Sequence, residues 1–410
     1  MKDRFLLPLT KAEAISLDDG YYQFNTEGVR MMFEPPSLDA AEQHVLGEID
    51  ELKNKLRWQL HEPRRWYGSL RRLSFARAIQ GSNSIEGFDA ALDDAAAVAL
   101  GEEPLDADQE TRLALKGYRD AMTYVLQLSA ETDFAYSGQL LRSLHFMMTG
   151  YDLRNRPGQW RSGAVYVRND ETGEIVYEGP DLDLVPGLVT ELVTHMNDDE
   201  ETPRLIHAGM AHLNLVMIHP FRDGNGRMAR CLQSLVLARG GVLAPVFMSI
   251  EEYLGRNTEE YYAVLGQVGN GSWQPHNDAR PWIRFTLKAH LRQARTLLRR
   301  VRESERLWVE LEVLAKKHGL NERTISVLFD AASGLRVRNA TYRAGLAEAG
   351  EEITDQTASR DLRDLVSAGA LASRGQARGR YYVASPDLAA IRAKIVSARD
   401  PRDDSDPFGA

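Results

Sequence analysis

Residues 219–230 read His-Pro-Phe-Arg-Asp-Gly-Asn-Gly-Arg-Met-Ala-Arg. This stretch brings an imidazole, a carboxylate and a glycine-rich turn into one short segment. It also carries Arg227 and Arg230, which are three residues apart and therefore share a face if the segment is helical. A lone His-Pro or Gly-Asn-Gly is usually a turn, but this combination of groups indicates a functional site.

The residues on both sides of this stretch predict helices. Residues 205–218 are apolar almost all round, which is typical of a helix that is buried on most of its faces. Residues 227–238 repeat apolar side chains at helical spacing, and Gly240 follows as a stop signal. The glycine-rich turn therefore opens the second helix.

A glycine turn at a helix start suits phosphate. The first N–H groups of a helix have no partner inside the helix, and the helix dipole is positive at that end. We therefore expect Gly224, Asn225 and Gly226 to bind a polyphosphate. Arg227 and Arg230 would extend the grip with forked donors.

Two further side chains of the stretch carry chemistry. Asp223 offers a carboxylate of the kind that binds Mg²⁺ together with substrate phosphates. His219, with a reference pKa of about 6.5, could accept a proton from an incoming nucleophile.

The stretch resembles the signature of the Fic family, His-x-Phe-x-(Asp/Glu)-Gly-Asn-Gly-(Arg/Lys)-x-x-Arg, and every defined position is matched. The resemblance implies a mainly α fold, a Fic-type helical bundle with a β-hairpin flap. It also implies an enzyme that uses Mg²⁺ and transfers AMP from ATP to a Ser, Thr or Tyr hydroxyl of a target protein, and to itself. In that role His219 is the base and Asp223 holds the metal.

Composition agrees with a soluble globular protein. The chain has 410 residues, enough for two or three domains, with 43% hydrophobic and 27% charged residues. We found no apolar run near the roughly 18 residues of a membrane span and no signal-like core, so we expect a cytoplasmic protein. The only cysteine, Cys231, falls on a core face. The net charge of −9 disfavours bulk attraction to nucleic acid but leaves room for a local basic patch.

Residues 70–87 predict a helix that ends at Gly87, with Ser82 and Glu86 on one face. Taken alone, Glu86 would be a solvated surface residue. The run 82–87 nevertheless resembles the Fic inhibitory motif, (Ser/Thr)-x-x-x-Glu-(Gly/Asn). The resemblance implies that Glu86 pairs with Arg230 and keeps ATP from its productive pose. Some relatives also use this glutamate to position a water that removes AMP.

Residues 162–180 alternate apolar and polar side chains around a polar turn, which predicts a β-hairpin. On the local pattern this hairpin is either a structural excursion or a functional element. The resemblance implies the family's flap, which aligns a target segment by main-chain pairing. Val165 and Val167 are then the candidate docking residues.

Residues 259–265 predict a helix that contains Tyr262, and Asn270 follows in a glycine-flanked loop. Aromatic residues at this spacing also suit a hydrophobic core. The resemblance implies that Tyr262 and Asn270 lie beside the adenine. The loop 269–278 is longer than usual for the family, which leaves the role of Asn270 open.

We divide the chain into five parts. These are an N-terminal region with the inhibitory helix, a catalytic core, a connecting helix, a small module and a disordered tail, at residues 1–108, 109–302, 303–318, 319–398 and 399–410. In the small module, three helices and a basic hairpin resemble a winged helix-turn-helix.

This small module leaves two interpretations open. Its candidate DNA contacts are Arg360, Arg363, Arg374 and Arg378, and the chain would then be a nucleotide-sensing DNA-binding regulator with a Fic core. Winged helices also serve as protein-interaction or dimerisation modules, and aspartates on the third helix oppose phosphate binding. A homodimer is the expectation under that second interpretation.

Overall fold

The computed structural model describes residues 15–16, 22–23, 31–61, 64–168, 172–199, 201–240, 245–401, 403 and 405–409. The fold is mainly helical with a few short strands, as predicted. Its helices are α1 (Ala40–His61), α2 (Tyr67–Ser84), α3 (Leu92–Ala99), α4 (Gln109–Leu128), α5 (Gly138–Thr149), α6 (Val185–Asp198), α7 (Arg204–Ile218), α8 (Asn225–Ala238), α9 (Glu251–Arg256), α10 (Thr258–Gly269), α11 (Arg280–Lys317), α12 (Ile325–Ala332), α13 (Asn339–Glu348), α14 (Asp355–Ser367) and α15 (Pro386–Ser397). Among the described residues, no helix is long and apolar enough to cross a membrane.

The strands form three small sheets. They are β1 (Ile15–Ser16) with β2 (Tyr22–Gln23), β3 (Tyr166–Arg168) with β4 (Ile175–Glu178) and β5 (Gly271–Ser272), and β6 (Leu371–Arg374) with β7 (Tyr381–Ala384). The predicted hairpin is confirmed, since β3 and β4 pair antiparallel with Tyr166 opposite Glu178. β5 adds a parallel strand to β4, which the sequence did not indicate.

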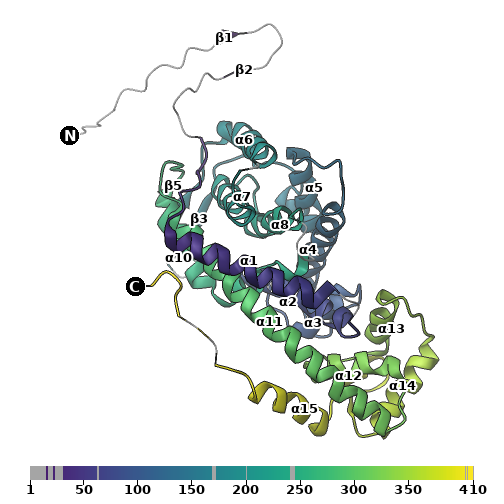
Figure 1. The fold of residues 1–410 in the computed structure, drawn as a ribbon. Coiled ribbons are helices and arrows are strands. Elements are labelled where there is room, and N and C mark those ends of the chain that lie inside the picture. The colour runs from purple at the N-terminus through teal and green to yellow at the C-terminus, as the bar shows by residue number, and fades with distance from the viewer. Residues whose placement is uncertain are drawn as a thin grey trace.

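The core of the larger part is built around α7 and α8. Figure 1 shows these two helices in the middle of that part, with α4, α5 and α6 around them. The apolar residues of α7 are buried on nearly every face because α6, α8 and α11 pack against it. The segment between α7 and α8 is the signature stretch, so its loop is held at both ends by the most buried helices of the fold.

The position of α2, the predicted inhibitory helix, is fixed by a close crossing. α2 meets α9 at Gly81, where an added Cβ would lie 2.4 Å from the carbonyl oxygen of Glu251. Gly255 of α9 faces the same point, and its Cβ would lie 2.7 Å from the Gly81 oxygen. Only glycine allows the two backbones to approach this closely. The crossing sets the position of the end of α2 relative to α8.

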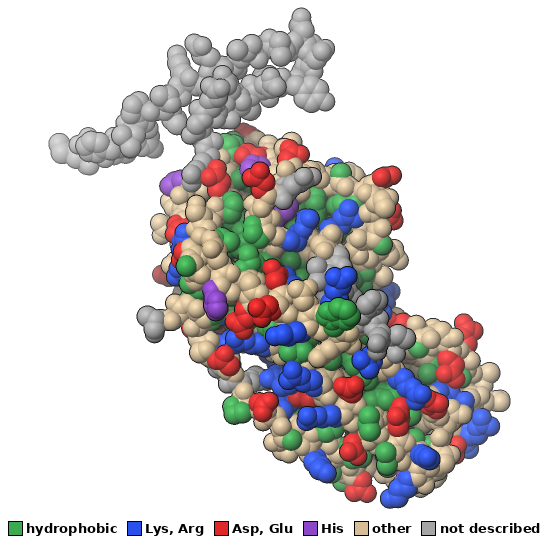
Figure 2. Space-filling view, in the orientation of Figure 1, with side chains coloured by type: hydrophobic (Ala, Val, Ile, Leu, Met, Phe, Trp, Pro, Cys, Tyr) green, Lys and Arg blue, Asp and Glu red, His purple; other side chains and the backbone are tan. Residues whose placement is uncertain are grey.

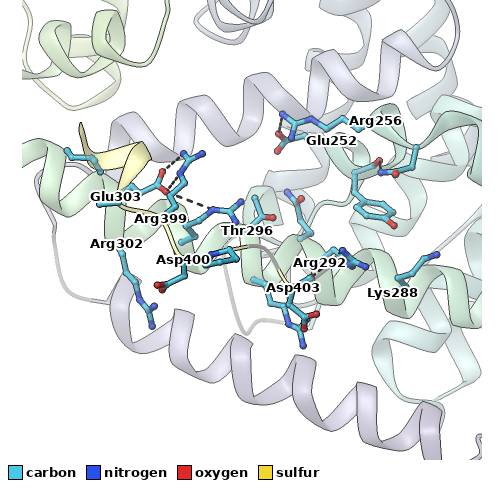
Figure 3. Close-up of a pocket in the computed structure, with 18 of the residues that line it drawn as sticks. Glu252, Arg256, Lys288, Arg292, Thr296, Arg302, Glu303, Arg399, Asp400 and Asp403 are labelled. Atoms are coloured by element: carbon cyan, nitrogen blue, oxygen red, sulfur yellow. Dashed lines mark hydrogen bonds and ion pairs between the residues drawn. The ribbon is translucent and has the colours of Figure 1, made fainter. Parts of the chain in front are cut away.

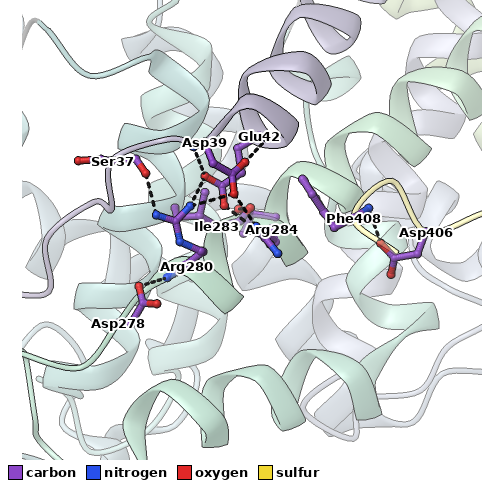
Figure 4. Close-up of polar contacts among 10 residues, drawn as sticks. Ser37, Asp39, Glu42, Asp278, Arg280, Ile283, Arg284, Asp406 and Phe408 are labelled. Carbon is purple, nitrogen blue, oxygen red and sulfur yellow. Dashed lines mark hydrogen bonds and ion pairs between the residues drawn. The ribbon is translucent and has the colours of Figure 1, made fainter. Parts of the chain in front are cut away.

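A polar cluster joins the starts of α1 and α11 (Figure 4). Asp39 and Glu42 bond each other's backbone N–H groups at 2.9 Å, which caps α1. Arg280 and Arg284 donate to the fully buried Glu42 carboxylate at 2.6 and 2.9 Å. The buried charge is therefore paired on both oxygens.

α11 differs from the prediction of a separate connecting helix at 303–318. The structure has one helix from residue 280 to residue 317, about 57 Å long at 1.5 Å per residue. The sequence 282–317 contains no glycine or proline, and buried residues such as Leu297, Val301 and Leu307 continue through the expected boundary. α11 therefore belongs both to the catalytic core and to the smaller C-terminal part.

That C-terminal part has the predicted order of elements, three helices and then a hairpin. α12, α13 and α14 precede β6 and β7, and Thr354 caps α14 by accepting from the Thr357 N–H at 3.2 Å. Val337 adds an isolated bridge to Tyr382 of β7. α15 then packs back on α11.

The prediction of a disordered tail at 399–410 is wrong for the residues described. Arg399 donates to Glu303, Asp403 accepts from Arg295, and Phe408 packs on the core. The composition is polar enough for disorder, but its charges find partners on α11, which local composition cannot reveal.

Candidate active site

The signature loop begins and ends with left-handed residues. His219 closes α7 with φ of 52°, and Gly224 precedes α8 with φ of 77°. A Cβ on Gly224 would also lie 3.0 Å from the Thr149 side chain. The second helix begins at Asn225, two residues earlier than predicted, so Gly226 and Arg227 belong to its first turn.

His219 is arranged as a neutral base. Its Nδ1 lies 3.2 Å from the Val216 carbonyl oxygen, which assigns the proton to Nδ1 and leaves Nε2 as the acceptor. Burial lowers the pKa of His219 to about 4, although the Val216 carbonyl and Glu86 act in the opposite direction. The imidazole is therefore uncharged at pH 7.

Asn225 fixes the loop from inside. Its buried side chain accepts from the Phe221 N–H and donates to the Phe221 carbonyl, both at 2.9 Å. Both ends of the amide are used within the loop. We therefore expect Asn225 to serve a nucleotide through the shape of the loop and its backbone N–H.

Glu86 and Arg230, predicted to pair, lie in direct contact. Arg230 Nη2 donates to Glu86 Oε1 at 2.6 Å and to the Ser82 carbonyl at 2.9 Å, and its Nε donates to Ser82 Oγ at 2.8 Å. Burial alone would lower the pKa of Arg230, but Glu86 and two tyrosines raise it above its usual value. Arg230 therefore stays charged although it is 1% exposed.

The Glu86 carboxylate also lies on the first turn of α8. A Cβ on Gly226 would be 2.3 Å from Glu86 Oε1, so only glycine leaves room for the carboxylate there. Gly87, with φ of 80°, turns the chain just after Glu86. A protein carboxylate thus takes the anion position at the start of α8.

Asp223 points toward groups that suit a metal-bound phosphate. It is 46% exposed, accepts from Asn155 Nδ2 at 3.1 Å, and lies 3.6 Å from Arg227 Nη2. Among the described residues, no cluster of three or more His, Cys, Asp and Glu side chains could hold a metal by itself. A single carboxylate fits Mg²⁺, which can take its other ligands from phosphates and water.

Arg227 is buried beside the inhibitory segment. It is 1% exposed, its guanidinium lies 5.0 Å from the centre of the Phe88 ring, and Nη1 is 3.4 Å from the Tyr151 hydroxyl. Phe88 and Tyr151 were not predicted as site residues.

His145 of α5 is a second residue that the sequence did not indicate. Its ring stacks on Phe221, with centroids 3.8 Å apart. Because the Gly158 N–H donates to Nδ1 at 2.8 Å, Nε2 must carry the proton and donates to the Asp223 carbonyl at 3.0 Å. Burial lowers the pKa of His145 to about 4, so it stays neutral. This histidine fixes the backbone of the metal-binding candidate.

Arg161 is a third such residue, and it joins the flap to the loop. Its Nε donates to the His219 carbonyl at 3.1 Å, and its backbone N–H donates to the Pro220 carbonyl at 2.8 Å. Nη1 donates to the Gly163 carbonyl at 2.7 Å, and Nη2 to that of Pro180. One guanidinium therefore holds both ends of the flap against the His219 backbone.

The flap places the two predicted docking residues differently. Val167 lies in β3, which is an outer strand of its sheet because β4 and β5 are on one side only. Val165 lies before β3, and its Cγ1 is within 2.7 Å of a Cβ built on Gly179, so it packs at the base of the flap. The Tyr177 hydroxyl donates to the Met217 carbonyl at 2.7 Å and fixes β4 to α7.

Tyr262 lies beside the inhibitory segment. Its ring is 46% exposed and its hydroxyl donates to the Ile85 carbonyl at 3.3 Å. The neighbouring Tyr261 is buried and bonds His212 at 3.0 Å, so it is the core member of the pair. Asn270 is exposed and ends α10 in the left-handed conformation with φ of 46°, which gives it a turn role.

The candidate DNA contacts of the C-terminal part are exposed on one helix and one strand. Arg360 and Arg363 of α14 and Arg374 of β6 are exposed, while the Arg378 side chain lies outside the described residues. Asp361, counted against DNA binding, is buried and paired with Arg323 at 2.7 Å.

Part of this chain is similar to a known protein family and to proteins named after it. Residues 136–237 match the Fic/DOC family. Protein adenylyltransferase Fic of Nematostella vectensis is 26% identical over 275 residues, covering 62% of this chain and 55% of the relative. Protein adenylyltransferase fic-1 of Caenorhabditis briggsae is 37% identical over 128 residues, covering 29% of this chain and 23% of the relative. The chain thus spans about half or less of the length of these relatives.

Two solved structures share the fold. A Fic family protein from Desulfovibrio desulfuricans G20 has a TM-score of 0.54 and 22% identity, covering 86% of this chain and 98% of that chain. A fragment of Fic-1 from C. elegans has a TM-score of 0.52 and 22% identity, covering 65% of this chain and 74% of that fragment. The family match itself runs from just before α5 to the end of α8 and contains the whole loop around His219. Residues 136–237 of this chain, with the whole loop around His219, therefore match the Fic/DOC family, and the fold agrees with that match.

Proposed function

We propose that this chain transfers AMP from ATP to a side-chain hydroxyl of a target protein, and to itself. The observation that carries the proposal is the Glu86 carboxylate, which lies on the first turn of α8 and is bound by Arg230 at 2.6 Å. A site that accepts an anion between backbone N–H groups and a guanidinium suits a polyphosphate. The relatives named adenylyltransferases support the choice of AMP.

In the proposed complex, residues 224–227 and Arg230 hold the polyphosphate. Asp223 would hold Mg²⁺, which supplies positive charge to the phosphate oxygens when bound. Asn155 and His145 keep Asp223 oriented, because one bonds its carboxylate and the other its carbonyl. Tyr262, whose hydroxyl donates to the Ile85 carbonyl, is the proposed contact for the nucleoside end.

The proposed proton transfer goes to His219 Nε2. The target hydroxyl gives up its proton, its oxygen bonds to the α-phosphorus, and the bond to the departing pyrophosphate breaks. The left-handed backbone of His219 directs the ring, and Arg161 fixes the adjacent carbonyl. Positioning and charge stabilisation would supply most of the rate, as in phosphoryl transfer.

In this proposal, autoinhibition arises because Glu86 and ATP compete for Arg230. Arg230 cannot hold the Glu86 carboxylate and the terminal phosphate of ATP at the same time. Arg230 is buried and Glu86 is 23% exposed, so salt screens this pair less than it screens a surface pair. Productive ATP binding therefore requires Glu86 to move away. Removal of AMP with Glu86 positioning a water is a related proposal for the same carboxylate.

Intact mass spectrometry after incubation with ATP and Mg²⁺ tests the reaction. We expect an AMP-sized adduct on the Glu86→Gly protein or on an added protein target, little on the wild type, and none on the Glu86→Gly, His219→Ala double variant. A Glu86→Gly protein that modifies neither itself nor any target would contradict the proposed activity.

DNA binding by the C-terminal part is a second candidate function. We propose it because the pairing of Asp361 with Arg323 removes one negative charge from the exposed face that carries Arg360 and Arg363. A winged helix-turn-helix would use these residues on phosphates or bases. Salt-dependent retention of a DNA duplex that Arg360→Glu abolishes would support it. Dimerisation without retention would favour the protein-interaction alternative.

A further inference from the structure

α11 carries a stripe of cations along one face. The spacing is four, three, four, three and four residues, so the side chains follow the helical repeat over about 27 Å. The members of this stripe are Lys288, Arg292, Arg295, Arg299, Arg302 and Arg306. Six cations on one helix face stand out in a chain of net charge −9. Three of them, Lys288, Arg295 and Arg299, also pair with acidic side chains of the fold, namely Glu260, Glu48 and Glu303.

The stripe lines a cavity of about 790 Å³. Figure 3 shows the cavity between α11 and residues 399–403, with Glu252 and Arg256 of α9 at its far end. Its lining contains no residue of the signature loop. In Figure 2, Lys and Arg side chains gather over the same part of the molecule, between α11 and α15.

The chain's own C-terminal segment lies along this stripe in the opposite direction. Asp403 accepts from Arg295 at 2.6 Å, and Asp406 lies 3.5 Å from Lys288. Arg292 donates to the carbonyl oxygens of residues 403 and 405, at 3.3 and 2.9 Å. An extended acidic segment is therefore recognised through two carboxylates three residues apart and through its backbone.

Phe408 ends this segment in an apolar hollow. The hollow has a volume of about 410 Å³ and lies between α10 and α11, with Val264 and Phe285 in its lining. The Arg284 guanidinium lies 5.4 Å from the centre of the Phe408 ring. Figure 4 shows Asp406 and Phe408 next to the α1–α11 cluster.

We propose that this face of α11 is a docking groove for an extended acidic segment of a partner protein, and that residues 399–409 fill it as a built-in competitor. The contacts define the partner: two carboxylates three residues apart, followed after one residue by an aromatic ring. Backbone and ring contacts favour a peptide over nucleic acid. The tail carboxylates are half exposed, and such ion pairs are weak and screened by salt, so a partner can displace them. This inference does not depend on AMP transfer.

The test uses a full-length chain whose tail is released by Asp403→Asn, Asp406→Asn and Phe408→Ala. A fluorescent peptide copy of residues 399–410 is the probe, and binding is followed by anisotropy. We expect the released chain to bind the peptide at least tenfold more tightly than the wild type. A chain that ends at residue 398 provides the same comparison without any tail. Equal binding by wild type and both released chains would overturn the proposal.

Charge reversals locate the groove. Arg292→Glu with Arg295→Glu in the released chain is expected to weaken peptide binding at least tenfold. Lys316→Glu with Lys317→Glu, at two exposed lysines of α11 outside the groove, is the matched control and is expected to leave peptide binding unchanged. A shuffled peptide of the same composition is expected to bind at least fivefold more weakly. Equal binding of the shuffled peptide, or stronger competition by a single-stranded oligonucleotide, would contradict the proposed peptide groove. Either result would indicate a surface that binds polyanions in general.

Discussion

At the scale of single residues, Arg161 and His145 fix the signature loop by bonding its backbone carbonyl oxygens. Arg161 donates to three carbonyl oxygens, and His145 donates to the Asp223 carbonyl oxygen. His219 depends on the first and Asp223 on the second.

Arg161→Lys is expected to lower kcat for AMP transfer by about 10–100-fold in a Glu86→Gly background. An ammonium cannot reach the three carbonyls together, so the flap and His219 lose their common anchor. Steady-state kinetics with ATP provide the measurement, and KM for ATP is expected to change little. Arg168→Lys, an exposed arginine of the flap, is the control. An unchanged kcat in Arg161→Lys would contradict the anchoring role.

The lowered pKa of His145 predicts that the free energy of unfolding depends on pH. Burial lowers its pKa from 6.5 to about 4, so below pH 6.5 the unfolded chain binds more protons than the folded one. The neutral His145 side chain contributes up to about 3 kcal/mol to the free energy of unfolding above pH 6.5, and this stability is lost as the pH falls toward 4. Urea unfolding at pH 7 and pH 5 measures this loss. His145→Gln is expected to reduce the loss, and His44→Gln, at an exposed position, is expected to leave it intact.

At the scale of elements, α2 leads directly to Glu86, the proposed inhibitory residue, and the crossing of α2 with α9 sets its position. Gly81→Ala would place a Cβ 2.4 Å from the Glu251 carbonyl oxygen, so α2 must shift. We expect a loss of about 1–3 kcal/mol in the free energy of unfolding and a higher basal rate of AMP transfer. Gly47→Ala on α1, where nothing lies within 4 Å, is the control. A destabilised variant whose basal rate equals that of the wild type would contradict the coupling of this crossing to inhibition.

The elements also show what the sequence could predict. The helices beside residues 219–230, the hairpin and the cap at Thr354 follow from apolar spacing and turn residues, and the structure has them. β5 is only two residues long, and its pairing with β4 depends on distant residues. His145 looks like an ordinary core residue of a helix, and Arg161 acts through carbonyls that any sequence would offer. Such contacts leave no local pattern.

At the scale of the whole molecule, ion pairs join the C-terminal part to the N-terminal region that contains α2 and α3. Arg72 Nη2 of α2 lies 3.2 Å from Asp330 Oδ2 of α12. Arg336 contacts Asp93 and the buried Asp94 of α3. These contacts join α2 and α3 to the C-terminal part, while α11 runs through both parts of the molecule (Figure 1).

Arg336→Ala is expected to lower the free energy of unfolding by about 2–4 kcal/mol, because it leaves buried carboxylate charge unpaired. Chemical denaturation measures the loss, and the Arg336→Ala, Asp93→Ala double variant is expected to recover part of it. Arg343→Ala on α13 is the control. Additive losses in the double variant would show that the two side chains do not interact.

The account rests on Glu86 competing with ATP for Arg230, and one rate comparison tests that claim most directly. The initial rate of AMP incorporation is measured for the wild type, for Glu86→Gly, for Glu131→Gly as an exposed control, and for Glu86→Gly with Arg230→Ala. We predict that Glu86→Gly raises the rate at least tenfold, that Glu131→Gly leaves it unchanged, and that Arg230→Ala abolishes the gain. A gain that survives the loss of Arg230, or a Glu86→Gly protein no faster than the wild type, would contradict the account.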